Sequence, residues 1–388
     1  MSVTAAEGFV ASGAAIGIKG AERLDGALVA SSSGPVATGA VFTQNKAPAA
    51  PVQVSRAHLA ATRGQIQAVV LTSGNANAAT GDEGLVAANT LCEEVAASLG
   101  CAADQVLVCQ TGLIGVPFPL SATEGRVAGL VASLGPSAED GHQAATAIMT
   151  TDTFAKEALV ESEGFVIGGM AKGAAMLAPN MATMLAVLTT DADLTAETLT
   201  ASLSVAVASS FNALDVDGAT STNDTVIIMS SGERTNVDVD AFTEALTQAC
   251  ATLAEAMAFD AEGATKAVRV TLTGAASDAE AHQGARKVAT SQLVKCSLNG
   301  EDPYWGRVLS EVATAGIELD PALVAISYGG TVVARGSIAV PHDAEAVAAH
   351  MAERWNSIEV DLGLGEGVGS ILTTDLGYGY IDENRTTS

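Results

Sequence analysis

Hydrophobic and polar residues recur along the chain with two different periods, which predicts a mixture of helices and strands. Apolar residues return every three to four positions in Leu85–Leu99 and Ala241–Phe259, a spacing that is typical of amphipathic helices. Short runs rich in β-branched residues predict strands at Val106–Val108, Val268–Leu272 and Ile358–Leu362. Because the two kinds of element follow each other along the whole length, the chain is predicted to be an α/β or α+β protein.

Another pair of apolar runs predicts a β-hairpin in the last third of the chain. Val324–Tyr328 and Thr331–Ala334 are separated only by Gly329 and Gly330, and two glycines suit the positive φ angles of a two-residue turn. Part of the sheet is therefore predicted to be antiparallel. No internal repeat or low-complexity linker is found, so any division of the chain is expected to be chemical and not a flexible hinge.

The most unusual stretch is residues 168–188, where glycines and a proline give way to a short apolar run. Pro179 and the glycines disfavour a helix, whereas Met184–Leu188 is apolar and compact enough to be a buried strand. Thr183 stands directly before this run. The pattern predicts a threonine hydroxyl at the leading end of a buried strand.

A threonine in this position can act as an N-terminal nucleophile. Its Oγ attacks the preceding carbonyl carbon, the peptide rearranges to an ester, and hydrolysis of the ester leaves Thr183 as a new chain start. The freed α-amine has a reference pKa of about 8, so it can accept the hydroxyl proton without a histidine. On residue types alone, an ordinary turn threonine is the alternative interpretation.

A second candidate is the predicted turn Thr111-Gly112, which follows the apolar run at Val106–Val108. Such a turn can direct a hydroxyl and a backbone N–H toward one point. Two donors that converge about 3 Å from a developing oxyanion are what acyl transfer requires. An ordinary strand-ending turn is again the alternative.

Two stretches dense in polar side chains, Asp215–Asp224 and Asp260–Lys266, are further candidates. The first begins like a calcium loop, but it lacks the glutamate that an EF-hand requires at its twelfth position, so a polar structural loop is favoured. In the second, Glu262 is interpreted either as a surface charge at a helix end or as a ligand for a substrate ammonium.

The net charge of the chain argues against nucleic acids and anionic membranes as binding partners. With 18 Lys and Arg against 44 Asp and Glu, the formal net charge is −26, whereas nucleic acids and anionic membranes bind through clustered basic residues. Neither is expected as a partner. No uncharged apolar run reaches the roughly 18 residues of a membrane-spanning helix, and Met1–Glu7 lacks the features of a secretion signal, so a cytoplasmic protein is expected.

Motifs for other chemistries are missing from the sequence. The five histidines form no HExxH pair, and there is no GxSxG elbow, Walker loop or strand-linked GxGxxG. The five cysteines are odd in number and include no CxxC pair, which predicts reduced thiols. No metal and no cofactor is expected.

Taken in order, the motifs make the chain resemble the ornithine acetyltransferase (glutamate N-acetyltransferase) family along nearly its whole length. Ala182–Leu185, after Lys172-Gly173 and Ala178-Pro179, is similar to the cleavage and nucleophile segment of that family. Other family-like motifs are Gly8–Gly13, Gly17–Lys19, Ala40–Thr43, Ser73–Ala78, Thr111-Gly112, Thr150–Thr153, Val216–Gly218, Ser221–Asp224, Asp260–Gly263, Asp302-Pro303 and Trp305–Arg307. One departure is Gln110, which stands where the family usually has serine.

The resemblance implies a layered α/β/β/α sandwich that is autocleaved between Ala182 and Thr183. Residues 1–182 would be the α chain, with the oxyanion hole and much of the substrate site, and residues 183–388 the β chain, which begins at the nucleophile. The two chains would stay associated as an α2β2 heterotetramer.

The resemblance also implies the roles of single residues. Thr183 is the nucleophile, and Thr111 and Gly112 form the oxyanion hole. The implied substrate contacts are Thr150, Lys172, Thr183, Glu262, Asn384 and Ser388. Lys172 suits an anionic group of an amino-acid substrate and Glu262 an ammonium, each through a charge-assisted hydrogen bond.

The implied activity is ping-pong transfer of acetyl from N-acetylornithine to glutamate in arginine biosynthesis, through an acetyl-Thr183 enzyme. Acetyl-CoA as a further co-substrate is left open, as is a paralogue that serves a clavulanic-acid-type secondary pathway. Rival interpretations are an N-terminal-nucleophile amidohydrolase or aminopeptidase, with water as acceptor, and an uncleaved binding protein without activity.

Overall fold

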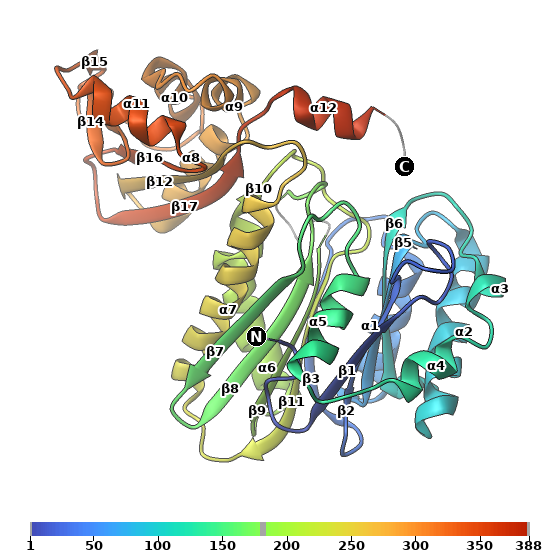
Figure 1. Cartoon of the computed structure of the whole chain (residues 1–388). Helices are drawn as coiled ribbons and strands as arrows, with labels where there is room; N and C mark the ends of the chain where they lie inside the picture. The colour runs from blue at the N-terminus through green and yellow to red at the C-terminus, as the bar shows by residue number, and fades with distance from the viewer. Residues whose placement is uncertain (1, 179–183, 386–388) are drawn as a thin grey trace. The chain divides into compact units, whose positions relative to one another are not determined.

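The computed structural model describes residues 2–178 and 184–385, which form two compact units (Figure 1). Each unit has its own sheet structure and its own hydrophobic core. The first unit comprises Met1–Asn212 and Ala219–Met257, and the second comprises Ala213–Gly218 and Ala258–Thr387.

The first unit contains a four-stranded and a six-stranded sheet. The smaller sheet, of order β1-β2-β5-β6, is formed by β1 (Phe9–Ala14), β2 (Gly26–Ser31), β5 (Ala68–Asn75) and β6 (Val106–Leu113). The larger sheet, of order β4-β3-β11-β9-β8-β7, is formed by β3 (Val36–Phe42), β4 (Gln65–Ile66), β7 (Lys156–Ser162), β8 (Phe165–Lys172), β9 (Leu185–Ala192) and β11 (Thr225–Arg234). β5 runs parallel to β6 and β9 parallel to β11, while the other neighbours are antiparallel.

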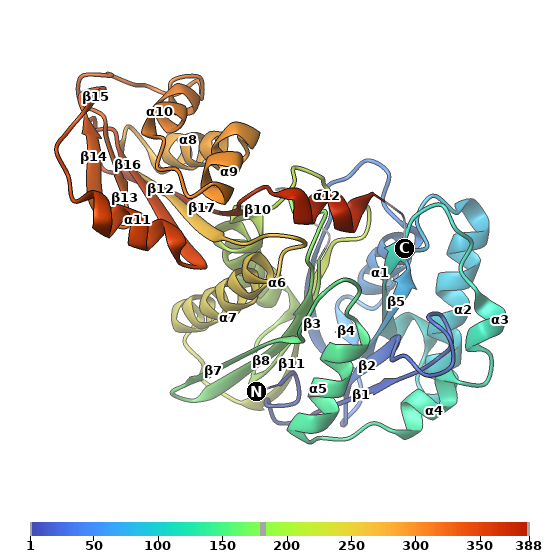
Figure 2. The ribbon, with the colours of Figure 1, turned by 45° about the horizontal axis from the view of Figure 1, so that its top comes forward.

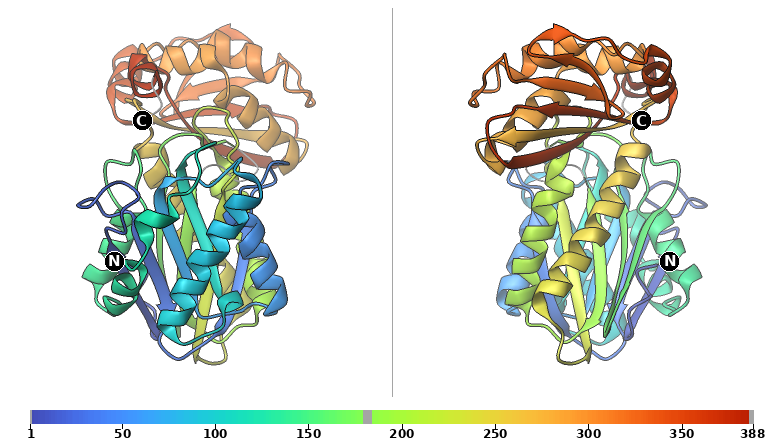
Figure 3. Two further views of the ribbon diagram at one scale, coloured as in Figure 1. Left: turned by 90° about the vertical axis from the view of Figure 1, so that its right-hand side faces the viewer. Right: turned by 90° about the vertical axis from the view of Figure 1, so that its left-hand side faces the viewer.

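Side-chain alternation along the strands explains why these sheets are covered on both faces. In β5, Val69 and Leu71 belong to the core between the two sheets, whereas Ala68 and Val70 belong to the core shared with helices. An apolar strand of this kind is stable only when both of its faces are buried. Figure 3 shows α1 (Ala50–Ala61) and α2 (Gly81–Leu99) over the smaller sheet in its left view, and α6 (Ala196–Ser209) and α7 (Val239–Phe259) over the larger sheet in its right view.

The first unit is therefore layered α/β/β/α, which confirms the predicted sandwich. Phe242 of α7 contacts Phe165 of β8, with ring centroids 5.5 Å apart. The helices of this unit are α1 (Ala50–Ala61), α2 (Gly81–Leu99), α3 (Leu120–Thr123), α4 (Val127–Ala132), α5 (Ala138–Ala147), α6 (Ala196–Ser209) and α7 (Val239–Phe259).

The second unit is built on one seven-stranded sheet of order β10-β17-β12-β16-β13-β14-β15 (Figure 2). Its strands are β10 (Leu214–Asp215), β12 (Ala267–Ala275), β13 (Ala325–Tyr328), β14 (Thr331–Arg335), β15 (Ile338–Ala339), β16 (Trp355–Asp361) and β17 (Gly367–Thr374). Its helices are α8 (Asp278–Ala289), α9 (Gln292–Asn299), α10 (Trp305–Val312), α11 (Ala344–Ala352) and α12 (Tyr378–Asn384). Alternate residues Val268, Val270 and Leu272 of β12 share one core with apolar residues of α8, α10 and α11.

The elements predicted from the hydrophobic pattern are confirmed. The two predicted helices lie within α2 and α7, and the predicted strands correspond to β6, β12 and β16. The hairpin joins β13 to β14, with Tyr328 opposite Thr331 and with φ angles of 55° at Gly329 and 76° at Gly330. The strand predicted at Met184–Leu188 is β9, which begins one residue later and continues to Ala192.

The pattern did not predict a separate second unit. The proposed division into residues 1–182 and 183–388 is a chemical one, which these units do not follow, and it stays a prediction.

Among the cysteines, Cys92, Cys109 and Cys250 are buried, whereas Cys296 on α9 is exposed. In the described part of the chain, no helix combines the length and the apolar character needed to cross a membrane.

Candidate active site

Thr111 and Gly112 lie in the last part of β6, and not in a turn after it as predicted. Their partners on the parallel strand β5 are Ser73 and Gly74. Gly112 has a φ angle of 129°, and a Cβ atom there would fall 2.3 Å from the carbonyl carbon of Gly74. The backbone conformation and the close approach of the two strands therefore both require glycine at position 112.

Lys172, a residue of the larger sheet, contacts this end of β6. It is the last residue of β8 and only 3% exposed, and its Nζ donates a hydrogen bond to Oγ1 of Thr111 over 3.2 Å. Because the Thr111 oxygen accepts this bond, its own hydrogen can be donated to another acceptor. Two residues that are 61 positions apart in the sequence, and that were predicted separately, thus form one polar cluster.

The start of β9 is fixed beside this cluster. Lys172 pairs with Leu185, the first residue of β9. The N–H of Met184 donates to Oδ1 of Asp224 over 3.0 Å, and the N–H of Thr225 donates to the Met184 carbonyl over 3.1 Å. Burial raises the pKa of the Asp224 carboxyl well above its usual value, although the Met184 N–H and the charge of Lys172 act against this shift.

The predicted nucleophile Thr183 and cleavage partner Ala182 lie outside the described residues. Thr183 is, however, covalently joined to Met184, which the structure describes. The described contacts hold the Met184 peptide between Asp224 and the end of β8. The bond predicted to be cleaved, between Ala182 and Thr183, therefore lies one residue before a backbone segment that is anchored next to Lys172.

Asp152 organises the second part of the cluster. Its carboxylate accepts hydrogen bonds from the N–H of Thr150 at 3.0 Å and of Gly173 at 2.8 Å, and from Nζ of Lys156 at 2.6 Å. Burial raises the pKa of Asp152, but the charges of Lys172 and Lys156 and the hydrogen bonds outweigh it and lower the pKa to about 2. This carboxylate therefore links Thr150, a predicted substrate contact, to the end of β8.

Replacing Asp152 with asparagine is expected to destabilise the protein by about 3–5 kcal/mol, because the amide cannot neutralise the buried ammonium of Lys156. The measurement is urea unfolding at pH 7 and at one fixed protein concentration. The control is Glu7→Gln, which breaks an exposed ion pair to Arg234 at 3.2 Å and should cost less than about 1 kcal/mol. Equal losses in the two variants would contradict this role of Asp152.

The same ion pair predicts how stability depends on pH. In the folded protein Asp152 stays charged down to about pH 2, whereas an unfolded aspartate titrates at about pH 4. Its stabilising contribution is therefore complete at neutral pH, declines as the pH falls below about 4, and is lost near pH 2. Between about pH 4 and pH 2 the free energy of unfolding of Asp152→Asn should therefore fall less than that of the native protein.

Two buried amides, Asn223 and Gln110, connect the strand ends. Nδ2 of Asn223 donates to the carbonyls of Ala76 at 2.6 Å and Gln110 at 2.8 Å. The Gln110 side chain is fully buried and accepts a hydrogen bond from Nδ2 of Asn77 at 2.8 Å. Gln110, which departs from the usual serine, is therefore a satisfied part of the scaffold beneath Thr111.

The second unit brings together two other predicted substrate contacts. Nδ2 of Asn384, at the end of α12, donates to Oε2 of Glu262 over 2.7 Å. Gly263 has a φ angle of 62°, and a Cβ atom there would lie 2.1 Å from the backbone of Gly379, so the close packing of α12 requires this glycine. The remaining predicted contact, Ser388, lies outside the described residues.

The predicted site residues thus form two groups in the structure. Thr111, Gly112, Thr150 and Lys172 belong to the first unit, and Glu262 and Asn384 to the second. At the polar stretch Asp215–Asp224, Nζ of the buried Lys295 donates to the Val216 carbonyl at 2.9 Å, and it also donates to the Thr373 hydroxyl at 2.6 Å. Within the described residues, no cluster of three His, Cys, Asp or Glu side chains is arranged to hold a metal.

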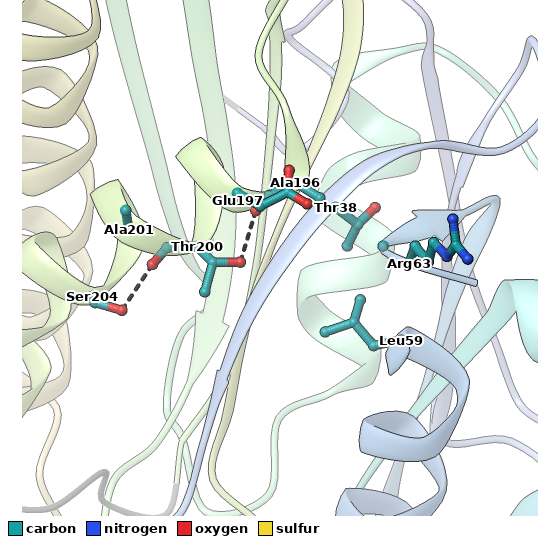
Figure 4. Close-up of a pocket in the computed structure, with 9 residues that line it drawn as sticks. Thr38, Leu59, Arg63, Ala196, Glu197, Thr200, Ala201 and Ser204 are labelled. Carbon is teal, nitrogen blue, oxygen red and sulfur yellow. Dashed lines mark hydrogen bonds between the residues drawn. The ribbon is translucent and has the colours of Figure 1, made fainter. Parts of the chain in front are cut away.

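A groove of about 470 Å³ lies elsewhere on the first unit (Figure 4). It is bounded by α6, by the end of α1 and by β3, and Arg63 and Glu197 are its charged residues. Thr200 and Ser204 at its rim bond to the carbonyls one turn earlier in α6, at 2.8 Å each. None of the described predicted site residues lines this groove.

Asp152, Asp224 and Asn223 are the residues near the site to which the sequence interpretation gave no role. Asp152 and Asp224 each follow threonine-rich motifs in the sequence, but nothing in the spacing indicates which backbone groups their carboxylates accept from. Their roles depend on contacts with residues 21 to 147 positions away, which only folding brings together.

The sequence matches the ArgJ family over residues 10–386. It is 45% identical over 390 residues to the arginine biosynthesis bifunctional protein ArgJ of Thermobifida fusca, and both chains are covered in full.

Two solved structures are also similar to the chain. One is the arginine biosynthesis bifunctional protein ArgJ of Bacillus halodurans, with 36% identity over 51% of this chain and 96% of that chain, and a TM-score of 0.49. The other is the ornithine acetyltransferase of Mycobacterium tuberculosis in complex with ornithine, with 42% identity over 46% of this chain and 94% of that chain, and a TM-score of 0.44. From the family match and the full-length identity to the Thermobifida protein, we conclude that the chain belongs to the ArgJ family.

Proposed function

We propose that this chain is a glutamate N-acetyltransferase, which transfers acetyl from N2-acetyl-L-ornithine to L-glutamate through an acetyl-Thr183 enzyme. Membership of the ArgJ family makes it an acyltransferase of arginine biosynthesis. The observation that carries the finer proposal is the contact between Lys172 and Thr111 beside the start of β9. This contact supports the proposal because it joins the Thr111 hydroxyl to the Lys172 ammonium next to the segment that Thr183 precedes.

Maturation is the first reaction in this proposal. The Thr183 Oγ bonds to the Ala182 carbonyl carbon, the bond to the Thr183 nitrogen breaks, and the nitrogen takes up the hydroxyl proton. Water then hydrolyses the ester, which releases the Ala182 carboxylate and restores the Thr183 hydroxyl. The new α-amine, with a reference pKa of about 8, is the general base for later turnovers.

Transfer repeats this chemistry on the substrate. Thr183 takes the acetyl group from acetylornithine, and ornithine leaves as the amine after it gains a proton. The glutamate amine then attacks the acetyl ester and restores the hydroxyl. In each step the Thr111 hydroxyl and the Gly112 N–H donate to the oxyanion, while the nearby charge of Lys172 favours the negative oxygen.

One labelling experiment tests the proposal. The purified protein is incubated with deuteroacetyl-labelled acetylornithine, glutamate and unlabelled acetyl-CoA. Mass spectrometry then shows whether the N-acetylglutamate product carries the labelled or the unlabelled acetyl group. We expect labelled product that depends on glutamate and on a competent Thr183. Acetate release that is independent of glutamate would instead support the amidohydrolase, and an intact chain of 38.7 kDa without acyl-enzyme would support a silent binding protein.

The same experiment addresses acetyl-CoA as a second donor. The Thermobifida relative is named a bifunctional protein, and we propose that this chain also accepts acetyl-CoA. Unlabelled N-acetylglutamate in the same tube would measure this route directly. Its absence would identify a transferase that uses acetylornithine alone.

We also propose that the cleaved chains remain together as an α2β2 assembly. Light scattering after size-exclusion chromatography should then give about twice the 38.7 kDa of one complete chain. A mass equal to one chain would contradict the assembly without affecting the proposed chemistry.

A further inference from the structure

Lys19 is a charged residue beside the active-site cluster to which the proposed mechanism gives no role. It lies in the loop between β1 and β2, and a fully buried carboxylate fixes this loop. Oδ1 of Asp25 accepts the N–H of Ile16, and Oδ2 accepts the N–H of Lys19, both over 2.6 Å. The backbone at Lys19 is therefore held in one place.

The stem of Lys19 packs on the strand end that carries the predicted oxyanion hole. A Cβ atom at Gly74 would lie 2.9 Å from Cγ of Lys19, so this glycine leaves room for the side chain. Gly74 is the strand partner of Gly112. The Lys19 ammonium then reaches the carbonyl of Met149, the residue before Thr150, over 2.5 Å.

The charges around Lys19 favour an incoming anion. Burial, together with repulsion from Arg23 and Lys172, lowers the pKa of Lys19 to about 8, although Asp25 and Asp152 act in the opposite direction. Both carboxylates already accept hydrogen bonds from other groups. Asp25 accepts from two backbone N–H groups, and Asp152 accepts from the Lys156 ammonium and from two further backbone N–H groups. Among the described residues, no carboxylate forms an ion pair with Lys19.

We infer that Lys19 binds a carboxylate group of the amino-acid substrate and is thereby a specificity-determining residue. This inference rests on the proposed function, since that function supplies substrates with carboxylates. A half-buried ammonium that bonds one neutral carbonyl gains a charge-assisted hydrogen bond when a carboxylate arrives. Acetylornithine carries one carboxylate and glutamate two, so the two substrates distinguish which group is bound.

The first test compares Lys19→Met and Lys19→Arg with the native protein. Lys19→Met should raise KM roughly 10- to 100-fold with little change in kcat, and Lys19→Arg should restore most of the affinity. If KM rises for both substrates, Lys19 binds the α-carboxylate that they share. If KM rises for glutamate alone, Lys19 binds the side-chain carboxylate of glutamate. Unchanged KM values, or equal losses in kcat and thermal stability, would overturn the inference.

The matched control is Lys287→Met, which removes the same charge. Lys287 lies in the second unit, is about half exposed and pairs with Glu311 at 3.4 Å. Its loss should leave KM unchanged. A similar rise of KM in this control would attribute the effect to net charge and would also overturn the inference.

A pH series on acetylornithine binding gives a second test. Lys19 is charged below about pH 8 and loses its proton above it, so the native protein should bind more weakly as the pH rises through 8. The groups that face Lys19, namely Arg23 and Asp25 from its own loop, Lys172 from β8 and Asp152, are present in all variants. Lys19→Arg should therefore remove the weakening, because arginine keeps its charge. An identical pH profile in both proteins would contradict the inference.

Calorimetry separates this inference from the proposed function. The native protein should bind acetylornithine roughly 10- to 100-fold more tightly than its α-carboxamide, and Lys19→Met should lose this preference. If the native protein showed the preference but transferred no acetyl group, the proposed function would fail and the role of Lys19 would stand. If both proteins showed the same preference, the role of Lys19 would fail and the function would stand.

Discussion

Replacing Thr183 with alanine is expected to leave a single chain of 38.7 kDa with no measurable acetyl transfer. Autolysis and transfer need the same hydroxyl, so its removal should stop both reactions. The measurement is a denaturing gel beside the labelled acetylornithine assay. Thr183→Ser should still cleave, but more slowly than the native protein, because serine lacks the methyl group that restricts χ1 and aims the hydroxyl less firmly.

The outcome for Thr183→Ala is informative only if the variant folds. Thermal unfolding should therefore be compared with that of the native protein, with the Glu7→Gln variant as a surface reference. If Thr183→Ala were cleaved after Ala182 and still exchanged acetyl groups between ornithine and glutamate, the proposed mechanism would be wrong.

Replacing Thr111 with alanine should slow both autolysis and transfer by roughly 10²- to 10³-fold while the protein still folds. The substitution removes the hydroxyl that accepts from Lys172 and is free to donate to the oxyanion. Autolysis is followed on a gel after cell-free synthesis, so that the uncleaved chain is seen from the start. Transfer is measured as kcat once processing is complete.

Two further variants give this prediction its controls. Thr111→Ser keeps the hydroxyl and should retain most of both rates. Thr252→Ala removes an exposed threonine of α7 that donates to the Gln248 carbonyl at 3.0 Å, and it should change neither rate. Full activity of Thr111→Ala would show that the Thr111 hydroxyl does not stabilise the oxyanion.

The sequence by itself determined the elements and the candidate chemistry. Helices and strands depend on apolar spacing over a few residues, so α2, α7, β12 and the β13–β14 hairpin could be predicted from local pattern alone. On residue types alone an ordinary turn remained the alternative at Thr111, and it was the resemblance to the ornithine acetyltransferase family that implied roles for Thr111 and Lys172 in acyl transfer. The separate second unit was missed, because unit boundaries depend on which strands pair.

Only the tertiary structure decided which polar groups meet. Asp152 contacts Gly173, Asp224 contacts Met184, and Lys19 reaches Met149, across 21, 40 and 130 positions of sequence. Hydrogen bonds act over about 3 Å, and sequence spacing carries no information on such distances between separate strands. The residue types were therefore visible in the sequence, whereas their partners, their burial and their shifted pKa values arose from the packing of the two sheets.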